Sequence, residues 1–232
     1  MTVIFPMNGK GERFKKAGFN IPKPILPIGE ERLIQKVYKT YKCKDLSIIQ
    51  IISETLGKLK PFENLRLNII PFDTSGPLET ILSRFSRQSV FSDDILKDEE
   101  ILIADCDSFF EDPKELWDAV EEFRKSKLLG GVTVRETNDP GCSYANFQIL
   151  PGYAFDFREK DPYTPWSSTG PYYWKSWDTF YKCALQAYWD GVTSIAPVYN
   201  YLKEPVRAVE VQTFVHLGTP EAYLAYCRRT NV

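Results

Sequence analysis

The sequence predicts an α/β fold in which helices cover both faces of a sheet that contains parallel strands. Short apolar runs that suit buried strands alternate with segments of helical periodicity through residues 1–138. A hydrophobic content of 43% in 232 residues is enough to bury a sizeable core. Two of the predicted strands end at residues suited to phosphate or metal, and ligands of such sheets bind beyond the carboxyl ends of the strands.

In chain order, the first strand is Thr2–Met7, an apolar run that ends at a glycine-rich turn. A helix is predicted at Glu31–Tyr41, because Leu33, Ile34 and Val37 recur at helical spacing. The last helix of this half opens at a proline, the residue favoured in a first helical turn. The remaining elements are strands at Leu46–Ile52, Leu67–Phe72, Glu100–Ala104 and Gly131–Arg135, and helices at Leu78–Phe85 and Pro113–Lys125.

The pattern changes after Asp139. Tyr144–Leu150 and Tyr153–Arg158 predict a hairpin around a Pro-Gly turn. Aromatic residues then become frequent, and they suit a core or an oligomer surface, which leaves a homo-oligomer open. The last predicted elements are a helix that runs through Trp189, a strand at Val206–Gln212 and a helix at Pro220–Arg228. No linker or repeat divides the chain, so we expect one domain.

Charge and cysteine content exclude several classes of protein. The formal net charge is -2, which does not favour nucleic acid or an anionic membrane as the main partner. No apolar run approaches the ~20 residues of a membrane span, and the N-terminal segment predicts a strand instead of a signal peptide. The five cysteines are scattered without Cys/His spacing typical of a structural zinc site, so we expect reduced thiols and a cytoplasmic protein: Cys43, Cys106, Cys142, Cys183 and Cys227.

The loop after the first strand predicts a phosphate site. Gly9 and Gly11 let backbone N–H groups approach an anion, and Arg13 and Lys23 add positive charge. Phe14 stands where the dinucleotide-binding fingerprint has its third glycine, and no Gly-Lys-Ser/Thr follows as in a P-loop. The alternative is a surface loop with solvated charges.

Asp105 and Asp107 predict a magnesium site. They follow a buried strand, and residues two apart on a strand point the same way, so both carboxylates could face the crevice. The alternative is an acidic strand end that only caps a loop.

Six motifs in the same order resemble those of the sugar-phosphate nucleotidyltransferases and cover nearly the whole chain. They are Phe5–Phe14 with Pro22–Pro27, Asp73–Thr80, Ile103–Asp107, Glu159-Lys160, Ser168–Trp174 and His216–Glu221. The resemblance implies one Rossmann-like domain with a mixed sheet, of the GT-A-like type, over residues 1–232. It assigns residues 1–138 to the nucleotide and the metal and residues 139–232 to the acceptor.

The resemblance also implies roles for individual residues. Asp107 is the expected Mg²⁺ ligand and Asp105 a supporting or alternative one. His216 stands where the family often has a metal-binding aspartate, so it could bind metal, donate to a phosphate or orient the Gly218 turn. The other expected residues are Arg13, Lys23 and Lys160 in catalysis, Met7, Asn8, Gly9, Gly11, Gly76 and Glu79 at the nucleotide, and Tyr144, Glu159 and Gly170 at the acceptor.

The implied reaction transfers a nucleoside monophosphate from a nucleoside triphosphate to a small phosphorylated acceptor such as a sugar 1-phosphate, with release of pyrophosphate, for surface polysaccharide synthesis. Glu79 stands where the family often has glutamine. A carboxylate only accepts hydrogen bonds, which favours CTP through the cytosine amine, with GTP as a further option. The alternative is that Glu79 interacts with the N-terminus of its helix.

Two other functions remain open from the sequence. Asp105-Cys106-Asp107 fits the DxD metal motif of a GT-A-type glycosyltransferase, although such an enzyme has no triphosphate for Arg13 and Lys23 to hold. The histidine at position 216 is the one motif departure that supports a regulatory relative whose site has decayed.

Overall fold

The computed structural model describes residues 1–42, 46–57, 66–70, 72–85 and 97–230. Cys43 lies outside these ranges. Of the strand expected at Leu67–Phe72, residue 71 also lies outside them. The described strands form a nine-stranded mixed sheet in the order β5-β4-β1-β6-β11-β8-β12-β10-β9. Its strands are β1 (Thr2–Met7), β4 (Ser47–Ser53), β5 (Arg66–Ile70), β6 (Ile101–Ala104), β8 (Gly130–Glu136), β9 (Ser143–Gln148), β10 (Tyr153–Glu159), β11 (Trp166–Trp174) and β12 (Val206–Glu210).

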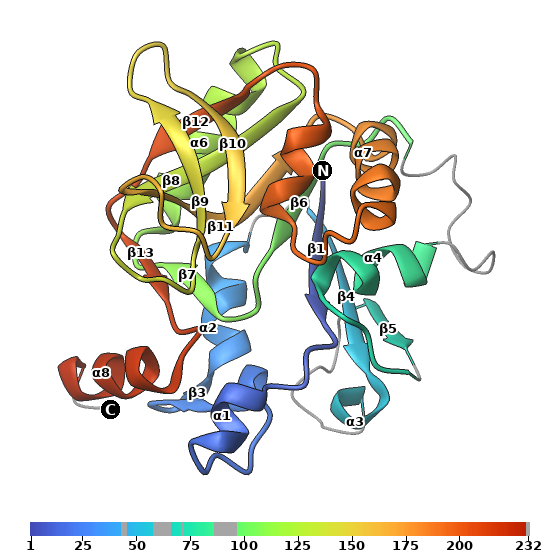
Figure 1. The fold of residues 1–232 in the computed structure, drawn as a ribbon. Helices are drawn as coiled ribbons and strands as arrows, with labels where there is room; N and C mark the ends of the chain where they lie inside the picture. Colours follow the sequence, from blue (N-terminus) through green and yellow to red (C-terminus); the bar gives the residue numbers. More distant parts are fainter. Residues whose placement is uncertain (43–45, 58–65, 71, 86–96, 231–232) are drawn as a thin grey trace.

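The first four strands of the sheet are parallel to one another, as their continuous apolar sequences predict. The mixed character arises at β11, which lies between β6 and β8 and runs antiparallel to both. β9 also pairs back with β11 at Tyr144 and Ser167, so the five strands β11, β8, β12, β10 and β9 close on themselves. Figure 1 shows this closed part beside the open parallel part.

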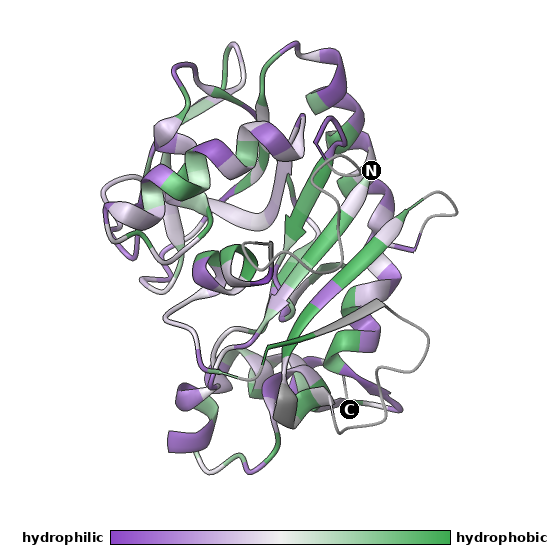
Figure 2. Cartoon of the chain, turned by 90° about the vertical axis from the view of Figure 1, so that its right-hand side faces the viewer, coloured by the Kyte–Doolittle hydropathy of each residue, from purple (hydrophilic) through white to green (hydrophobic). Residues whose placement is uncertain are grey.

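Helices cover both faces of the sheet, which confirms the predicted α/β class. One face packs against α2 (Leu33–Thr40), α6 (Pro113–Lys125) and α8 (Pro220–Arg229), and the other against α4 (Pro77–Phe85), α7 (Trp177–Trp189) and the 3₁₀ helix η3 (Ala196–Tyr201). In Figure 2 the strands are mostly hydrophobic along their length, whereas the helices carry both hydrophobic and hydrophilic residues. The short elements are α1 (Glu12–Lys16), η1 (Lys23–Ile25), α3 (Glu54–Gly57) and the strand pairs β2 (Pro27–Ile28) with β3 (Glu31–Arg32) and β7 (Ser108–Phe110) with β13 (Phe214–His216).

A hydrophobic core lies on each face of the sheet. This explains why polar and apolar residues do not alternate along the parallel strands. Val3, Phe5 and Met7 belong to the core beneath α2 and α6, whereas Ile4 belongs to the core beneath α4 and α7. All four side chains are at most 2% exposed. β1 therefore buries both of its faces, and it delivers the loop that follows it to a fixed place at the edge of the sheet.

The structure corrects two local expectations. The helix predicted at Glu31–Tyr41 begins only at Leu33, because the Gln35 side chain accepts the backbone N–H of Arg32 at 2.8 Å and closes the N-terminus there. The preceding residues form β3 instead. Asp105 and Asp107 do not continue a strand, since β6 ends at Ala104, so the strand rule does not determine where their carboxylates point.

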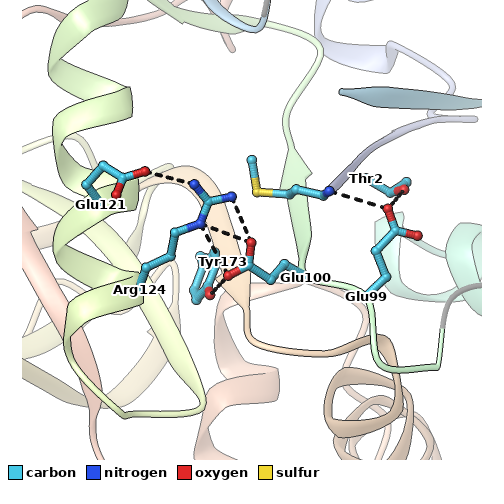
Figure 3. A network of polar contacts seen from close by, with 7 residues as sticks. Thr2, Glu99, Glu100, Glu121, Arg124 and Tyr173 are labelled. Atoms are coloured by element: carbon cyan, nitrogen blue, oxygen red, sulfur yellow. Dashed lines mark hydrogen bonds and ion pairs between the residues drawn. The ribbon is translucent and has the colours of Figure 1, made fainter. Parts of the chain in front are cut away.

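A polar network lies at the amino ends of β1 and β6, away from the loops that follow these strands (Figure 3). Arg124 of α6 makes an ion pair with Glu100 at 2.7 Å, and Tyr173 of β11 donates its hydroxyl to the same carboxylate at 2.7 Å. Partial burial acts to raise the pKa of Glu100, but the hydrogen bonds from Arg124 and Tyr173 outweigh it and lower the pKa. The network joins β6, α6 and β11 at this end.

Of the helices that the structure describes, none has the length and apolar character to cross a membrane.

Candidate active site

The predicted site residues gather at one edge of the sheet, where β1 and β6 end. A cavity of 260 Å³ opens there between the loop that starts α4, the turn after β6 and the strands β9 to β11. Of the predicted residues, Gly76, Asp105, Glu159, Lys160 and His216 line it. The position agrees with the rule that ligands of α/β sheets bind beyond the carboxyl ends of the strands.

The loop after β1 offers open backbone next to this edge. Asn8 is 3% exposed, and its side-chain amide donates to the carbonyl of Phe72 at 2.9 Å and to Thr74 Oγ1 at 3.1 Å. Among the described residues, Gly9 and Gly11 have no heavy atom within 4 Å of the place where a Cβ would stand, and Gly11 has a positive φ of 63°. Asn8 thus fastens a glycine turn whose outer side is free for an anion.

Lys23 and Asp107 form the polar centre of the site. The Lys23 ammonium makes an ion pair and a hydrogen bond with Asp107 Oδ2, and His216 Nε2 lies 3.8 Å from the same oxygen. Burial lowers the pKa of Lys23, while the charge of Asp105 acts in the opposite direction. A cation predicted for phosphate and a carboxylate predicted for metal therefore lie in direct contact.

Arg13 approaches the same region from α1. The guanidinium of Arg13 lies beside Gly141, and its Nη1 is 3.7 Å from the position that a Cβ on Gly141 would take. Arg13 is exposed, and its positive charge contributes to lowering the pKa values of both Lys23 and His216. Arg13 and Lys23 thus bring positive charge to one edge from two separate segments.

Asp105 lines the cavity and is held against Gly170. The backbone N–H of Asp105 donates to the Gly170 carbonyl at 3.3 Å, and a Cβ on Gly170 would stand 2.3 Å from Asp105 Oδ2. Burial raises the pKa of Asp105 to about 7, with Lys23 opposing the shift and Glu159 adding to it. A nearby cation would therefore stabilise the charged form of this carboxyl group, as Lys23 already does in part.

His216 lies at the end of β13, next to the turn that carries Asp107. The Leu217 N–H donates to the Asp107 carbonyl at 2.8 Å, and β13 pairs with β7 immediately after that turn. Burial, together with the positive charges of Lys23 and Arg135, lowers the pKa of His216 to about 4. At neutral pH the imidazole is therefore uncharged, in the form that can accept a proton or bind a metal.

Glu159 and Lys160 lie across the cavity at the end of β10. Ser143 donates its hydroxyl to Glu159, and the Lys160 ammonium lies 3.5 Å from the same carboxylate. Lys160 has a positive φ of 56° and its backbone N–H donates to the Cys142 carbonyl at 2.9 Å. This turn fixes the backbone, while half of the Lys160 side chain, 53%, stays exposed beside the cavity.

Just before α4, the Cα of Gly76 packs against the carbonyl oxygen of Thr193. A Cβ on Gly76 would stand 2.5 Å from that oxygen. The carboxylate of Glu79 accepts the backbone N–H of Ser75 at 2.5 Å, and this hydrogen bond is the main reason that its pKa is lowered. Glu79 is thus engaged at the N-terminus of its own helix, while Ser75 and Gly76 line the cavity.

Two predicted residues have their side chains in the protein interior. Met7 is 2% exposed and belongs to the core beneath α2, so only its backbone can face a nucleotide. Tyr144 is fully buried, and its hydroxyl donates to the Asp139 carbonyl at 2.8 Å.

The fold brings four further residues to this edge that no sequence motif marked as site residues: Arg135, Asp139, Cys142 and Ser143. Arg135 lies at the end of β8 with its guanidinium 5.0 Å from the centre of the Phe214 ring. The turn signal Asp139-Pro140-Gly141 marks the position of this segment, but only the fold brings it next to His216.

The donor set at the end of β6 fits Mg²⁺ in part. Asp105 and Asp107 offer carboxylate oxygens, which this hard cation prefers, and a positively charged group, the Lys23 ammonium, already lies on Asp107. Among the described residues, the one group of three His, Cys, Asp or Glu ligand atoms lying within 4.8 Å of one another is Asp139, Cys142 and His216. His216 therefore does not complete a three-ligand set with the two aspartates, and phosphate oxygens would supply the remaining ligands of a Mg²⁺ ion.

Comparison with known proteins bears on the fold. No protein-family model matches the sequence, and neither does a curated protein. Among solved structures, a nucleoside-diphosphate-sugar pyrophosphorylase from Vibrio cholerae matches 97% of this chain and 99% of its own, with a TM-score of 0.72 and 20% identity. A UDP-glucose pyrophosphorylase complexed with UDP-glucose matches 99% and 98%, with a TM-score of 0.77 and 15% identity. A UTP-bound UGPase from Acinetobacter baumannii matches 99% and 92%, with a TM-score of 0.73 and 15% identity. Over nearly its whole length, the chain has the fold of the sugar-phosphate nucleotidyltransferases that its six ordered motifs resemble.

Proposed function

We propose that the protein is a Mg²⁺-dependent nucleotidyltransferase that joins a nucleoside monophosphate to a small phosphorylated acceptor and releases pyrophosphate. The observation that carries the proposal is the junction of Lys23 with Asp107 beside Asp105, at the carboxyl ends of β1 and β6. It combines a cation for phosphates with carboxylates for a metal in the place where the fold binds ligands.

The reaction needs positioning and charge neutralisation more than proton transfer. A phosphate monoester is already mostly ionised at pH 7, so its oxygen can attack the α-phosphorus of the nucleotide without a general base. Gly9 and Gly11 would present backbone N–H groups to the triphosphate, with Arg13 and Lys23 balancing its charge. Lys160 would hold the phosphate of the acceptor, and Glu159 its hydroxyl groups. Mg²⁺, held by Asp105 and Asp107, would neutralise developing charge on the phosphates.

The proposed acceptor site is small and polar. The cavity has a volume of 260 Å³ and is lined by hydroxyl groups from four segments: Ser75, Ser143, Ser168, Thr169, Tyr172, Thr193 and Ser194. These groups suit a compact polyhydroxylated acceptor such as a sugar 1-phosphate, which supports a role in the synthesis of nucleotide sugars for surface polysaccharide. A cytoplasmic location, where nucleoside triphosphates are available, belongs to the same proposal.

The decisive experiment is a matrix of nucleoside triphosphates against sugar 1-phosphates, phosphocholine and other small phosphates, scored by pyrophosphate release with Mg²⁺. We expect pyrophosphate only when both substrates are present. Asp107→Asn should reduce the rate far more than Asp105→Asn, because Asp107 is the carboxylate in contact with Lys23. A protein that releases no pyrophosphate but transfers sugar from a ready-made sugar nucleotide would instead be a GT-A-type glycosyltransferase. One that binds nucleotide without turnover would be a decayed relative.

A preference for CTP is the finer part of the proposal. Glu79 begins α4 next to Ser75 and Gly76, which line the cavity, and its carboxylate can only accept hydrogen bonds. Its bond to the Ser75 N–H competes with contact to a base. Comparing kcat/KM for CTP and UTP in the wild type and in Glu79→Gln tests the idea. A wild type that prefers UTP, or a swap that leaves the preference unchanged, would show that Glu79 serves its helix alone.

A further inference from the structure

Three side chains of different chemistry converge beside the proposed active site. The carboxylate of Asp139, the thiol of Cys142 and the imidazole of His216 have their ligand atoms within 4.8 Å of one another. Cys142 and His216 line the cavity, whereas Asp139 approaches from the turn before β9. We propose that these three residues bind a transition-metal ion such as Zn²⁺, at a site that adjoins the proposed magnesium site of Asp105 and Asp107 but shares no ligand with it.

The ligand set distinguishes such an ion from magnesium. Nitrogen, thiolate sulfur and carboxylate oxygen together suit Zn²⁺ or Co²⁺, whereas Mg²⁺ prefers oxygen ligands and keeps much of its water. A tetrahedral zinc ion holds its ligand atoms about 3.4–3.8 Å apart, so small side-chain rotations would close the present spacing. Binding replaces the thiol proton of Cys142 with the metal and releases that proton to solvent.

The backbone holds two of the ligands in a fixed relation. Gly141 donates its N–H to Asp139 Oδ1 at 2.8 Å, and Cys142 donates its N–H to the Asp139 carbonyl at 3.2 Å. His216 comes from the distant strand β13, where its ring stacks on Phe214 with ring centres 6.5 Å apart and planes 22° apart. The ligands therefore belong to ordered elements rather than to flexible side chains that meet by chance.

Two buried donors next to Cys142 point to a thiolate. The hydroxyl of Ser167 and Nε of Arg135 are buried, and neither has a hydrogen-bond partner of ordinary geometry among the described residues. Both lie next to the Cys142 sulfur, to which each can donate a hydrogen bond. A metal-bound thiolate would give these two donors an acceptor, which explains why they are buried here.

The surrounding charges set the strength of the site. The positive charges of Lys23, Arg135 and Arg13 act on His216, and they would also repel a dication. The carboxylate and the thiolate together supply two negative charges, which balance the charge of the metal. With three protein ligands, the site keeps a coordination position for water or an anionic oxygen. We therefore expect an exchangeable metal rather than a permanently bound structural one.

Cobalt binding tests the inference without any substrate, so the result is independent of the proposed activity. The purified full chain is treated with a chelator, desalted and titrated with Co²⁺. We expect a thiolate-to-cobalt charge-transfer absorption that saturates at one equivalent, disappears on addition of Zn²⁺ and persists in excess Mg²⁺. His216→Ala and Asp139→Asn should each weaken Co²⁺ binding by about tenfold or more, because each removes one ligand.

A matched pair of cysteine variants makes the test specific. Cys142 and Cys183 are each 8% exposed, but Cys183 lies in α7, in the core. Cys142→Ser should abolish the absorption and Cys183→Ser should keep it, with unchanged circular dichroism in both. An absorption that is absent from the wild type, that survives Cys142→Ser, or that is insensitive to both His216→Ala and Asp139→Asn would overturn the proposal.

Discussion

Lys23 is the residue in which the proposed phosphate and metal parts of the site meet. Its ammonium contacts Asp107, and it acts electrostatically on Asp105 and His216. We expect Lys23→Ala to lower kcat/KM for nucleotide transfer at least about tenfold, or ~1.4 kcal/mol of transition-state stabilisation. Arg13→Ala should have a comparable effect. The control is Lys16→Ala on the same side of the loop, because Lys16 is exposed on α1. Wild-type rates in both Lys23→Ala and Arg13→Ala would remove the triphosphate assignment.

Asp105 gives the folded protein a distinctive response to pH. Because burial raises its pKa to about 7, the folded state binds a proton that the unfolded state, with a pKa of about 3.9, has released. The stability contributed by this group is present at low pH and is lost as the pH rises through about 7.

Asp105→Asn should therefore raise the Tm of the metal-free protein at pH 8 and change it little at pH 3, below the pKa of the unfolded state. Thermal unfolding of both proteins at the two pH values provides the measurement. An equal shift at both values would show that the substitution acts through packing and not through charge.

A side chain at Gly170 would add two costs, backbone strain and a close contact with Asp105, and comparison with Gly191 separates them. Its φ is 93°, and a Cβ would stand 2.3 Å from Asp105 Oδ2. Gly191 has a similar φ of 82°, but no heavy atom of the part of the chain that the structure describes lies within 4 Å of its Cβ position. Gly191→Ala should cost only the backbone strain, about 1–2 kcal/mol of unfolding free energy.

Gly170→Ala should cost more than this, and of the two it alone should reduce activity, because it displaces the Asp105 carboxylate. Urea unfolding and kcat/KM of the two variants check the prediction. Equal losses of stability with full activity in both would mean that the Asp105 contact is unimportant.

At the scale of elements, the network of Glu100 joins a strand to a helix and to the central strand β11. Glu100→Gln removes the charge that binds Arg124 and accepts from Tyr173, and should lower the unfolding free energy by up to about 1 kcal/mol. The pKa of Glu100 is lowered, so its contribution is present above its ordinary pKa of about 4.3 and lost as the pH falls through the folded value.

The difference between wild type and Glu100→Gln should consequently be larger at pH 7 than at pH 3. Urea unfolding at the two pH values measures it, with Glu136→Gln, an exposed glutamate at the end of β8, as the control. A difference that does not change with pH would mean that the ion pair contributes nothing.

Elements with strong local signals could be predicted from the sequence. The α6 helix begins at Pro113 as expected, and Asp112 caps it by accepting the Lys114 N–H at 3.0 Å. The strand pairs β2 with β3 and β7 with β13 were not predicted. Each has strands of only two or three residues, which exist because neighbouring elements hold them together, and that tertiary effect leaves no periodic pattern.

The same distinction applies to the site. Motif order predicts Lys23, Asp105 and Glu159 at one edge, and the structure brings them there. The convergence of Cys142 with His216 could not be predicted, because it depends on where β9 and β13 come to lie in the fold. Rules of ligand spacing detect metal sites only when the ligands are close in sequence.

At the scale of the whole molecule, β11 determines whether the two parts of the chain can exist apart. It belongs to residues 139–232, yet it pairs with β6 and β8 of residues 1–138. Tyr172 and Trp174 of β11 also belong to the core that contains Ile4 of β1. A fragment of residues 1–138 would lack the centre of its own sheet.

We therefore expect the fragment 1–138 to be unfolded or aggregated when it is expressed alone. The near-ultraviolet circular dichroism of the fragment, compared with that of the full chain, measures this. A soluble fragment with dispersed amide resonances in its NMR spectrum would show that the parallel part folds independently.

The late position of β11 in the chain also has a consequence for synthesis. A ribosome delivers β6 after its partner β1 but before its other partner β11, and roughly 70 further residues must be added before Trp174 appears, about 4–14 s at bacterial or eukaryotic elongation rates. Throughout that interval the edge of Ile101–Ala104, which is fully buried in the finished protein, has no strand beside it. An uncovered apolar strand edge is a template for pairing with other nascent chains, so we expect the soluble yield of this protein to rise when chaperones that shield such edges are co-expressed.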